Sequence, residues 1–222
     1  PISAVSKVTS DAGATIVKPA TISSLHAWEV DTTSPPFDKP AARQALSYAT
    51  DRAAMVKVAL QGQGIPATGN DLVNSKAPSY DKSLKGYPFN LDKAKALFQQ
   101  AGVKPGTTFT YWAESGARPE WVTMGEILQQ DLEKIGYHLK IVQSDPSTWL
   151  AKFYPNPKSF PGLIVANFLS LQPNPVLGLS FATSHKCECN WNNASYDQLY
   201  LKALGAGDAA TRQKVVNQMQ TM

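Results

Sequence analysis

Residues 107–142 read TTFTYWAESGARPEWVTMGEILQQDLEKIGYHLKIV, and this stretch decides the fold class. The residues of Thr107–Trp112 are all β-branched or aromatic, which is typical of a strand. Apolar residues then recur at helical spacing from Pro119 to Ile135, and Gly136 ends the predicted helix. Apolar and polar residues alternate over 137–142, which predicts a second strand. The strand, helix and strand form a βαβ unit, so we expect parallel strands and a right-handed crossover.

The segments on either side continue this α/β pattern. Asp38, Asp51, Asp92 and Asp208 each precede a helical pattern, and we predict that they are helix N-caps. The apolar run Leu163–Ala166 predicts a buried strand. The other predicted elements are strands at Ala14–Val17 and Thr21–Val30 and helices at Ser147–Phe153 and Ser195–Leu204.

The composition excludes several classes of protein. Of the 222 residues, 43% are hydrophobic and 17% are charged, which supports a folded core and argues against a disordered chain. No apolar run approaches the roughly 18 residues of a membrane-spanning helix. The 21 Lys and Arg and the 17 Asp and Glu are scattered along the chain, so we expect no nucleic-acid partner. The chain begins at Pro1 without a methionine, and we expect it to be a piece of a longer protein.

Signatures of catalysis are missing from the sequence. It contains no nucleophile elbow, no dinucleotide-binding glycine motif after a strand and no phosphate-binding Walker loop. His26 and His138 have no partner at the spacing of a catalytic triad or a metal site. The predicted N-caps account for several of the acidic residues without catalysis. We therefore expect a protein without catalytic residues and without a cofactor.

His185, Cys187 and Cys189 are the densest group of metal-ligand residue types. Structural zinc sites pair a Cys-x₂₋₄-Cys unit with a second pair of ligands elsewhere, and this sequence has no second pair. The alternatives are free thiols, a Cys-x-Cys disulfide, or a bridge to a cysteine in another segment. We predict no bound metal and keep a metal-binding module at these three residues as an alternative.

The stretch Pro35–Arg52 contains Pro-Pro-Phe-Asp followed by Ala-Arg-Gln-Ala-Leu-Ser-Tyr-Ala-Thr-Asp-Arg. Further blocks follow in order at Gly62–Ala67, Tyr87–Gly102, Ile127–Ile141 and Tyr196–Leu199. Together these blocks resemble the family 5 extracellular solute-binding proteins, the dipeptide, oligopeptide and nickel receptors of ABC importers. Only the Tyr87–Gly102 block departs from the family spacing, and it does so slightly.

The resemblance implies an α/β fold of the periplasmic-binding-protein-like type II class, with a mixed sheet flanked by helices. Family members have two lobes joined by hinge strands, and closure of the hinge traps the ligand. Residues 1–34 would then be hinge-flanking strands with a remnant of the preceding lobe. Residues 35–222 would be the C-terminal α/β lobe, truncated before its end.

The same resemblance implies a non-catalytic receptor. It would deliver a peptide-like or other small polar solute to the membrane subunits of an ABC importer. Such a receptor would be monomeric, periplasmic or extracellular, and membrane-anchored through a segment absent from this chain. The alternative is a sensory solute-binding domain of a regulator or chemoreceptor.

The candidate ligand-binding residues follow from two strands. Many peptide-binding members carry a Trp and an Asp just after the strand that matches Leu163–Ala166, and that Asp pairs with the peptide amino group. Residues 166–173 read ANFLSLQP and hold neither, which favours an uncharged, hydrogen-bonding ligand such as those of the glyco-, opine- or blocked-peptide members. Ligands also gather beyond the carboxyl ends of strands, here after Thr107–Trp112. For Trp121 and Trp191, core positions and surface anchors are both open. The predicted ligand-binding residues are Trp112, Glu114, Asn167, Phe168, Ser170 and Gln172.

Overall fold

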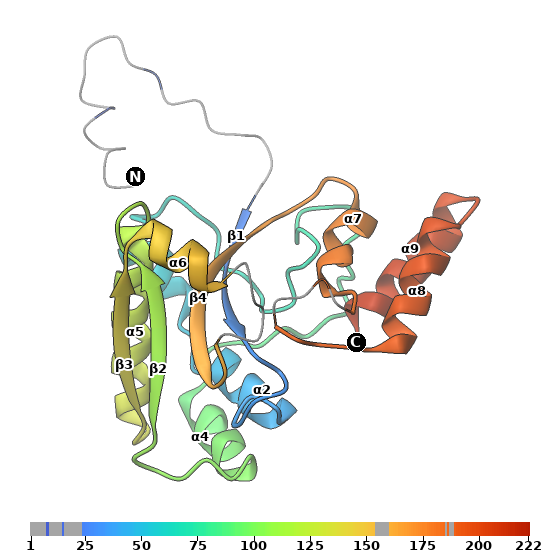
Figure 1. Ribbon diagram of the computed structural model, residues 1–222. Coiled ribbons are helices and arrows are strands. Elements are labelled where there is room, and N and C mark those ends of the chain that lie inside the picture. Colours follow the sequence, from blue (N-terminus) through green and yellow to red (C-terminus); the bar gives the residue numbers. More distant parts are fainter. Residues whose placement is uncertain (1–7, 9–14, 16–23, 154–159, 185, 187–188) are drawn as a thin grey trace.

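The computed structural model describes residues 8, 15, 24–153, 160–184, 186 and 189–222. Its centre is a four-stranded sheet in the order β1-β4-β2-β3 (Figure 1). The strands are β1 (Ser24–Val30), β2 (Thr108–Glu114), β3 (His138–Ser144) and β4 (Leu163–Ser170). β1 is antiparallel to β4, whereas β2 is parallel to both β3 and β4. The predicted mixed sheet is therefore confirmed, and the carboxyl ends of β2, β3 and β4 share one edge with the start of β1.

Helices surround this sheet on both faces. The helices are α2 (Pro40–Tyr48), α3 (Arg52–Val58), α4 (Leu91–Gln100), α5 (Pro119–Lys134), α6 (Pro146–Phe153), α7 (Pro175–Leu179), α8 (Ala194–Leu204) and α9 (Ala209–Gln220), with a 3-10 turn, η3 (Ser180–Ala182). Figure 1 shows α5 behind the sheet, α2 and α4 near its amino end, and α6 in front at its carboxyl end. Helices α7, α8 and α9 form a separate group beside β1. None of the helices in the described ranges is long and apolar enough to cross a membrane.

Most predicted elements are present, with two corrections at helix starts. Asp51 and Asp208 are N-caps as predicted, because their carboxylates accept from Ala54 N (2.9 Å) and Thr211 N (2.8 Å). The predicted caps at Asp38 and Asp92 are wrong. Lys39 precedes α2 and makes no capping bond with its side chain, whereas Asn90 Oδ1 caps α4 by accepting from Lys93 N.

The reason for the error at α4 is geometric. A capping side chain precedes the helix and accepts from an amide two or three residues later, which fits Asn90 and places Asp92 inside the first turn. Strand β4 also runs on to Ser170, beyond the predicted Leu163–Ala166. The predicted strand Ala14–Val17 lies outside the described residues, apart from Thr15.

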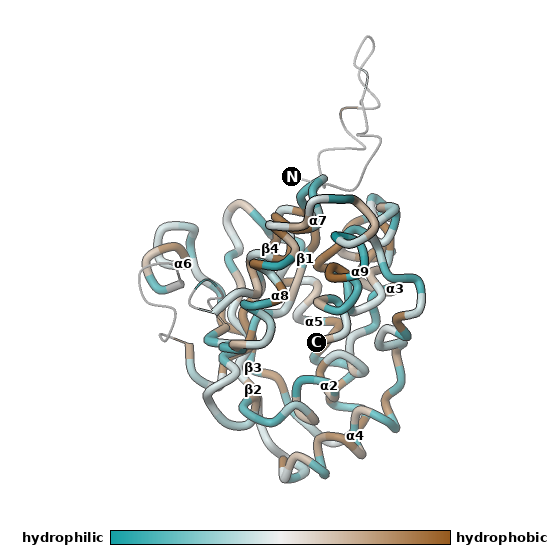
Figure 2. The backbone as a smooth tube through the Cα atoms, turned by 90° about the vertical axis from the view of Figure 1, so that its right-hand side faces the viewer, coloured by the Kyte–Doolittle hydropathy of each residue, from teal (hydrophilic) through white to brown (hydrophobic). Residues whose placement is uncertain are grey.

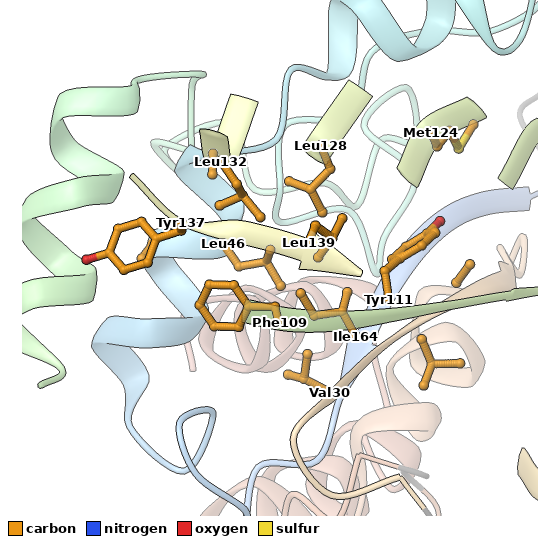
Figure 3. Close-up of a cluster of buried hydrophobic side chains, with 14 of the residues drawn as sticks. Val30, Leu46, Phe109, Tyr111, Met124, Leu128, Leu132, Tyr137, Leu139 and Ile164 are labelled. Carbon is orange, nitrogen blue, oxygen red and sulfur yellow. The ribbon is translucent and has the colours of Figure 1, made fainter. Parts of the chain in front are cut away.

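The main hydrophobic core lies between the sheet and helices α2, α4 and α5. In Figure 3, Met124, Leu128 and Leu132 of α5 face the sheet residues Tyr111 and Ile164. Along α4 the colouring alternates between apolar and polar residues (Figure 2), as expected for a helix with one buried face. A second core joins the 72–80 segment to the group of α7, α8 and α9; its buried residues are Val73, Val176, Leu179, Tyr196, Ala203, Val215, Val216 and Met219.

Replacing Gly125 with alanine should destabilise this core. A Cβ on Gly125 would clash with Cε1 and Cδ1 of Tyr111. The ring cannot move aside, because Tyr111 is fully buried and its hydroxyl donates to Trp121 O (2.8 Å). Overpacking of this kind costs about 1–3 kcal/mol, which exceeds the roughly 1 kcal/mol that alanine gains over glycine in a helix. Thermal unfolding checks this, with Gly207→Ala as the control, because a Cβ there meets nothing within 4 Å. Equal melting temperatures for the two variants would contradict the prediction.

Candidate functional site

The carboxyl edge of the sheet brings together segments that are distant in sequence. The turn at 115–118 follows β2, α6 follows β3, and residues 171–174 follow β4. The first residues of β1 reach the same edge, because Ser24 pairs with Ser170. In α/β sheets this edge is where ligands bind. All six predicted ligand-binding residues lie at or near it.

Trp112 and Glu114 lie on the face of the sheet that α6 partly covers. They are 5% and 3% exposed, and the ammonium of Lys152 in α6 lies 5.6 Å from the centre of the Trp112 ring. Glu114 Oε1 accepts a hydrogen bond from Ala117 N (2.7 Å). Glu114 therefore fixes the turn that leads into α5.

Asn167 lies on the same face of the sheet. Trp112 pairs with Val165, and Asn167 follows Val165 by one full period of the strand. Its amide nitrogen donates to Glu29 Oε2 of β1 (2.6 Å), and its side-chain oxygen accepts from Phe168 N (2.8 Å). Asn167 is 4% exposed, so its side chain is buried on this face of the sheet.

The Asn167–Glu29 contact adds a carboxylate that residues 166–173 do not contain. That stretch contains no carboxylate, but the pairing of β1 with β4 brings one from a position 138 residues away in sequence. A carboxylate is thus present beside β4, so the absence of one from the local sequence does not argue against a ligand that bears an ammonium group.

Phe168 points to the opposite face, the one covered by α5. It pairs with His26 across the β1–β4 ladder and packs against the main core. Ser170 is exposed at the end of β4, and Gln172 Nε2 lies 3.5 Å from its hydroxyl oxygen. The six predicted residues therefore divide between the two faces and the end of the strand rather than forming one cluster.

Arg118 occupies the centre of this edge, on the Phe168 side. Its guanidinium carbon lies 4.0 Å from the centre of the Phe168 ring and 5.0 Å from that of Trp121. Both distances fit cation–π contacts. Arg118 is half-buried, and its side chain contacts these two rings without a hydrogen bond or ion pair to another described residue. The five N–H groups of this cation are thus held in place by rings and keep their donor capacity.

Trp121 is the inner ring of this arrangement. It is 1% exposed, which resolves the question left by the sequence in favour of a core position. Its indole nitrogen donates to Nδ1 of His26 (2.8 Å), and its ring lies 5.7 Å from that of Trp149. Burial lowers the pKa of His26 from its ordinary value of 6.5; Glu120 opposes this shift and Arg118 adds to it.

The sequence contains a signal for Arg118 but none for His26 and Glu29. Arg118 stands between the end of a predicted strand and the proline that begins a predicted helix, a position at the carboxyl edge of the sheet. His26 and Glu29 reach the site only through the pairing of β1 with β4, which the sequence does not predict.

The cysteine segment offers no metal site in the described part of the chain. Cys189 is disulfide-bonded, so its sulfur is not available as a thiolate ligand. His185 and Cys187, the other members of the alternative site, lie outside the described residues. Among the residues that the structure covers, no three His, Cys, Asp or Glu side chains gather as ligands.

Comparison with known proteins identifies the family. The sequence profile of the "Bacterial extracellular solute-binding proteins, family 5 Middle" matches residues 1–170. Di/tripeptide-binding protein 3 of Pseudomonas aeruginosa is 30% identical over 201 residues, which are 85% of this chain and 36% of that protein. Heme-binding protein A of Haemophilus influenzae is 29% identical over 211 residues, 86% of this chain and 36% of that protein. The chain thus spans little more than a third of these relatives.

Solved structures agree with the sequence match. A dipeptide-binding protein of Pseudoalteromonas sp. SM9913, solved in complex with Met-Leu, superposes with a TM-score of 0.83 and 24% identity. The superposition covers 99% of this chain and 44% of that one, and it confirms the type II fold. The family and the fold are those of non-catalytic solute-binding proteins. The chain belongs to the bacterial extracellular solute-binding proteins of family 5.

Proposed function

We propose that this chain is the ligand-binding lobe of an extracytoplasmic receptor that delivers a small solute to the membrane subunits of an ABC importer. The family match over residues 1–170 supports this role. The receptor would act outside the cytoplasmic membrane, anchored to it by a segment beyond this chain. Binding would need no catalysis, because a hinge that closes two lobes over a ligand suffices to trap it.

We place the boundary of the lobe near Pro35. Residues 1–34 would include strands that flank the hinge, and residues 35–222 would form the C-terminal lobe. One observation supports this division: the segment after β1 turns directly into the helical layer at α2. β1 itself pairs with β4 along its whole length at the end of the sheet order, so it would join the hinge to this lobe.

The solute that we propose is peptide-like and carries a carboxylate. The observation that supports this most strongly is Arg118, whose guanidinium is stacked on Phe168 and Trp121 without an oxygen partner among the described residues. A planar guanidinium is well suited to bidentate hydrogen bonds with a carboxylate. The relatives are named for di- and tripeptides and for haem, all of which carry carboxylates.

The other predicted site residues would assist Arg118 in different ways. Ser170 and Gln172 would offer hydrogen bonds at the end of β4, where Ser170 is exposed. Phe168 would hold Arg118 in place through its ring. Glu114 and Asn167 would stabilise the backbone and strand pairing at this edge, since both are buried and hydrogen-bonded. Trp112, also buried, would support the same layer.

Thermal shift of the full-length protein tests this function. We expect a di- or tripeptide with a free carboxylate to raise the melting temperature, because a ligand at about 100 times its Kd stabilises by about 2.7 kcal/mol. The matched C-terminal amides should give a much smaller shift. A panel of such peptides and haem in which no compound raises the melting temperature would contradict the proposal. Equal shifts for acids and amides would contradict the role of the carboxylate.

A further inference from the structure

We propose that His26 is a positioning residue for Arg118, and that protonation of His26 weakens the binding of a carboxylate-bearing solute at this edge. His26 acts through Trp121, which lies between the two side chains. The effect on solute binding rests on the proposed function. The effect of His26 on the Trp121 ring does not, and it can be measured without any ligand.

A hydrogen bond joins the rings of His26 and Trp121. The indole nitrogen of Trp121 is a donor only, so Nδ1 of His26 must be an unprotonated acceptor at 2.8 Å. Neutral histidine meets this requirement with its proton on Nε2. Protonation at Nδ1 would set two N–H donors against each other. Since Trp121 is 1% exposed, its indole N–H would then be buried without an acceptor.

A cation also lies close to His26. Arg118 lies on the Trp121 ring and beside Phe168, which is the cross-strand partner of His26. A protonated His26 would therefore face a second cation across this cluster. Glu120, in the first turn of α5, partly offsets this repulsion. Glu29 lies on the opposite face of β1, because positions 26 and 29 alternate in the strand.

Trp121 in turn supports Arg118 directly. Main-chain contacts hold the Trp121 backbone, since its carbonyl accepts from the Tyr111 hydroxyl and its amide donates to Arg118 O. The orientation of the indole ring is fixed by the His26 bond and by packing against Trp149. Loss of the bond would let the ring turn, and Arg118 would lose one of its two stacking surfaces.

The direction of the pH effect follows from burial. The pKa of His26 lies below 6.5, so the residue is neutral at pH 7 and above. Affinity should be constant between pH 7 and 8 and should fall as the pH drops through this lowered pKa. In the unfolded chain His26 takes up its proton near its ordinary pKa of 6.5, so the folded state also loses stability as the pH falls below that value.

The experiment combines two variants with an NMR titration. His26→Asn keeps an acceptor oxygen close to the position of Nδ1 but cannot titrate, whereas His26→Phe keeps a ring and loses the acceptor. For the full-length wild-type protein with a bound dipeptide, we expect about 10-fold weaker affinity by calorimetry at a pH below the His26 titration midpoint than at pH 7.5, because Arg118 is then held less firmly. The asparagine variant should bind nearly as the wild type does at pH 7.5 and should lose this pH dependence. The phenylalanine variant should bind about 10-fold more weakly at both pH values.

The indole N–H resonance of Trp121 provides the ligand-independent measurement. It is identified by its loss in Trp121→Phe, and in the wild type it should shift with the same midpoint as the His26 ring protons. In His26→Asn it should not shift. A Trp121 resonance that does not shift when His26 titrates would overturn the inference. This outcome needs neither a bound solute nor a folded His26→Phe variant. Wild-type pH dependence of affinity in His26→Asn would also overturn it, whereas absence of binding at every pH would count against the proposed function alone.

Discussion

Replacing Arg118 with alanine should weaken the affinity of the full-length receptor for a free-carboxylate peptide by about 100-fold. The removal of one partner from a desolvated, hydrogen-bonded charge pair typically costs about 2–5 kcal/mol, and every 1.4 kcal/mol is about a factor of 10. In this structure the guanidinium already lies against the Phe168 and Trp121 rings, so little ordering entropy is lost on binding. Isothermal titration calorimetry of the variant measures the loss.

Two further variants separate the role of Arg118 from general effects of charge. Arg118→Lys keeps the cation but loses the planar fork, so its affinity should lie between those of the wild type and Arg118→Ala. Lys95→Ala removes an exposed cation from α4, at the other end of the sheet, and should change the affinity little. The melting temperature of unliganded Arg118→Ala should stay near that of the wild type, since each lost cation–π contact contributes only about 0.5–1 kcal/mol. Unchanged affinity in Arg118→Ala would remove Arg118 from the site.

Replacing Phe98 with alanine should have the largest effect on stability, about 3–5 kcal/mol. Phe98 is fully buried, and its ring centre lies 4.9 Å from that of Tyr137 and 5.2 Å from that of Phe109. The substitution removes the apolar surface of a whole ring and leaves a cavity among aromatic neighbours that cannot close it. Denaturant unfolding of the wild type and the variant measures the loss.

Phe89→Ala is the matched control for this prediction. It removes the same side chain from the segment just before α4, where Phe89 is 41% exposed. Its cost should be well below that of Phe98→Ala, because much of the ring already contacts water. Similar losses for the two variants would mean that the packing of α4 against the sheet is not as the structure shows.

Helices and strands could be predicted from the sequence where the local spacing of apolar residues is regular. The alternation around His138–Ser144 and the apolar stripe of α5 are strong periodic signals, and both elements form with nearly the predicted bounds. The N-cap of α4 could not be assigned as safely, since Asn90 and Asp92 both favour helix starts and only the bond to Lys93 N distinguishes them. The order of the strands, with β4 between β1 and β2, comes from pairings distant in sequence and has no local signal.

Local sequence patterns predict even less of the candidate site. The rule that ligands bind at carboxyl ends of strands selects Glu114 and Ser170, and both lie at the common edge. The rule does not distinguish side chains that support the edge, such as Asn167, from those with unused donors, such as Arg118. The sequence gives His26 no partner at the spacing of a catalytic triad or a metal site, yet Trp121 lies against it in the fold.

The main claim about this protein can be tested by native mass spectrometry of the full-length protein with a mixture of dipeptides. The claim is that the carboxyl edge around Arg118 forms one wall of a site for a carboxylate-bearing solute. We predict a wild-type adduct of one peptide per chain and no such adduct for Arg118→Ala at the same concentrations. No adduct with the wild type, or equal occupancy in the two proteins, would contradict it.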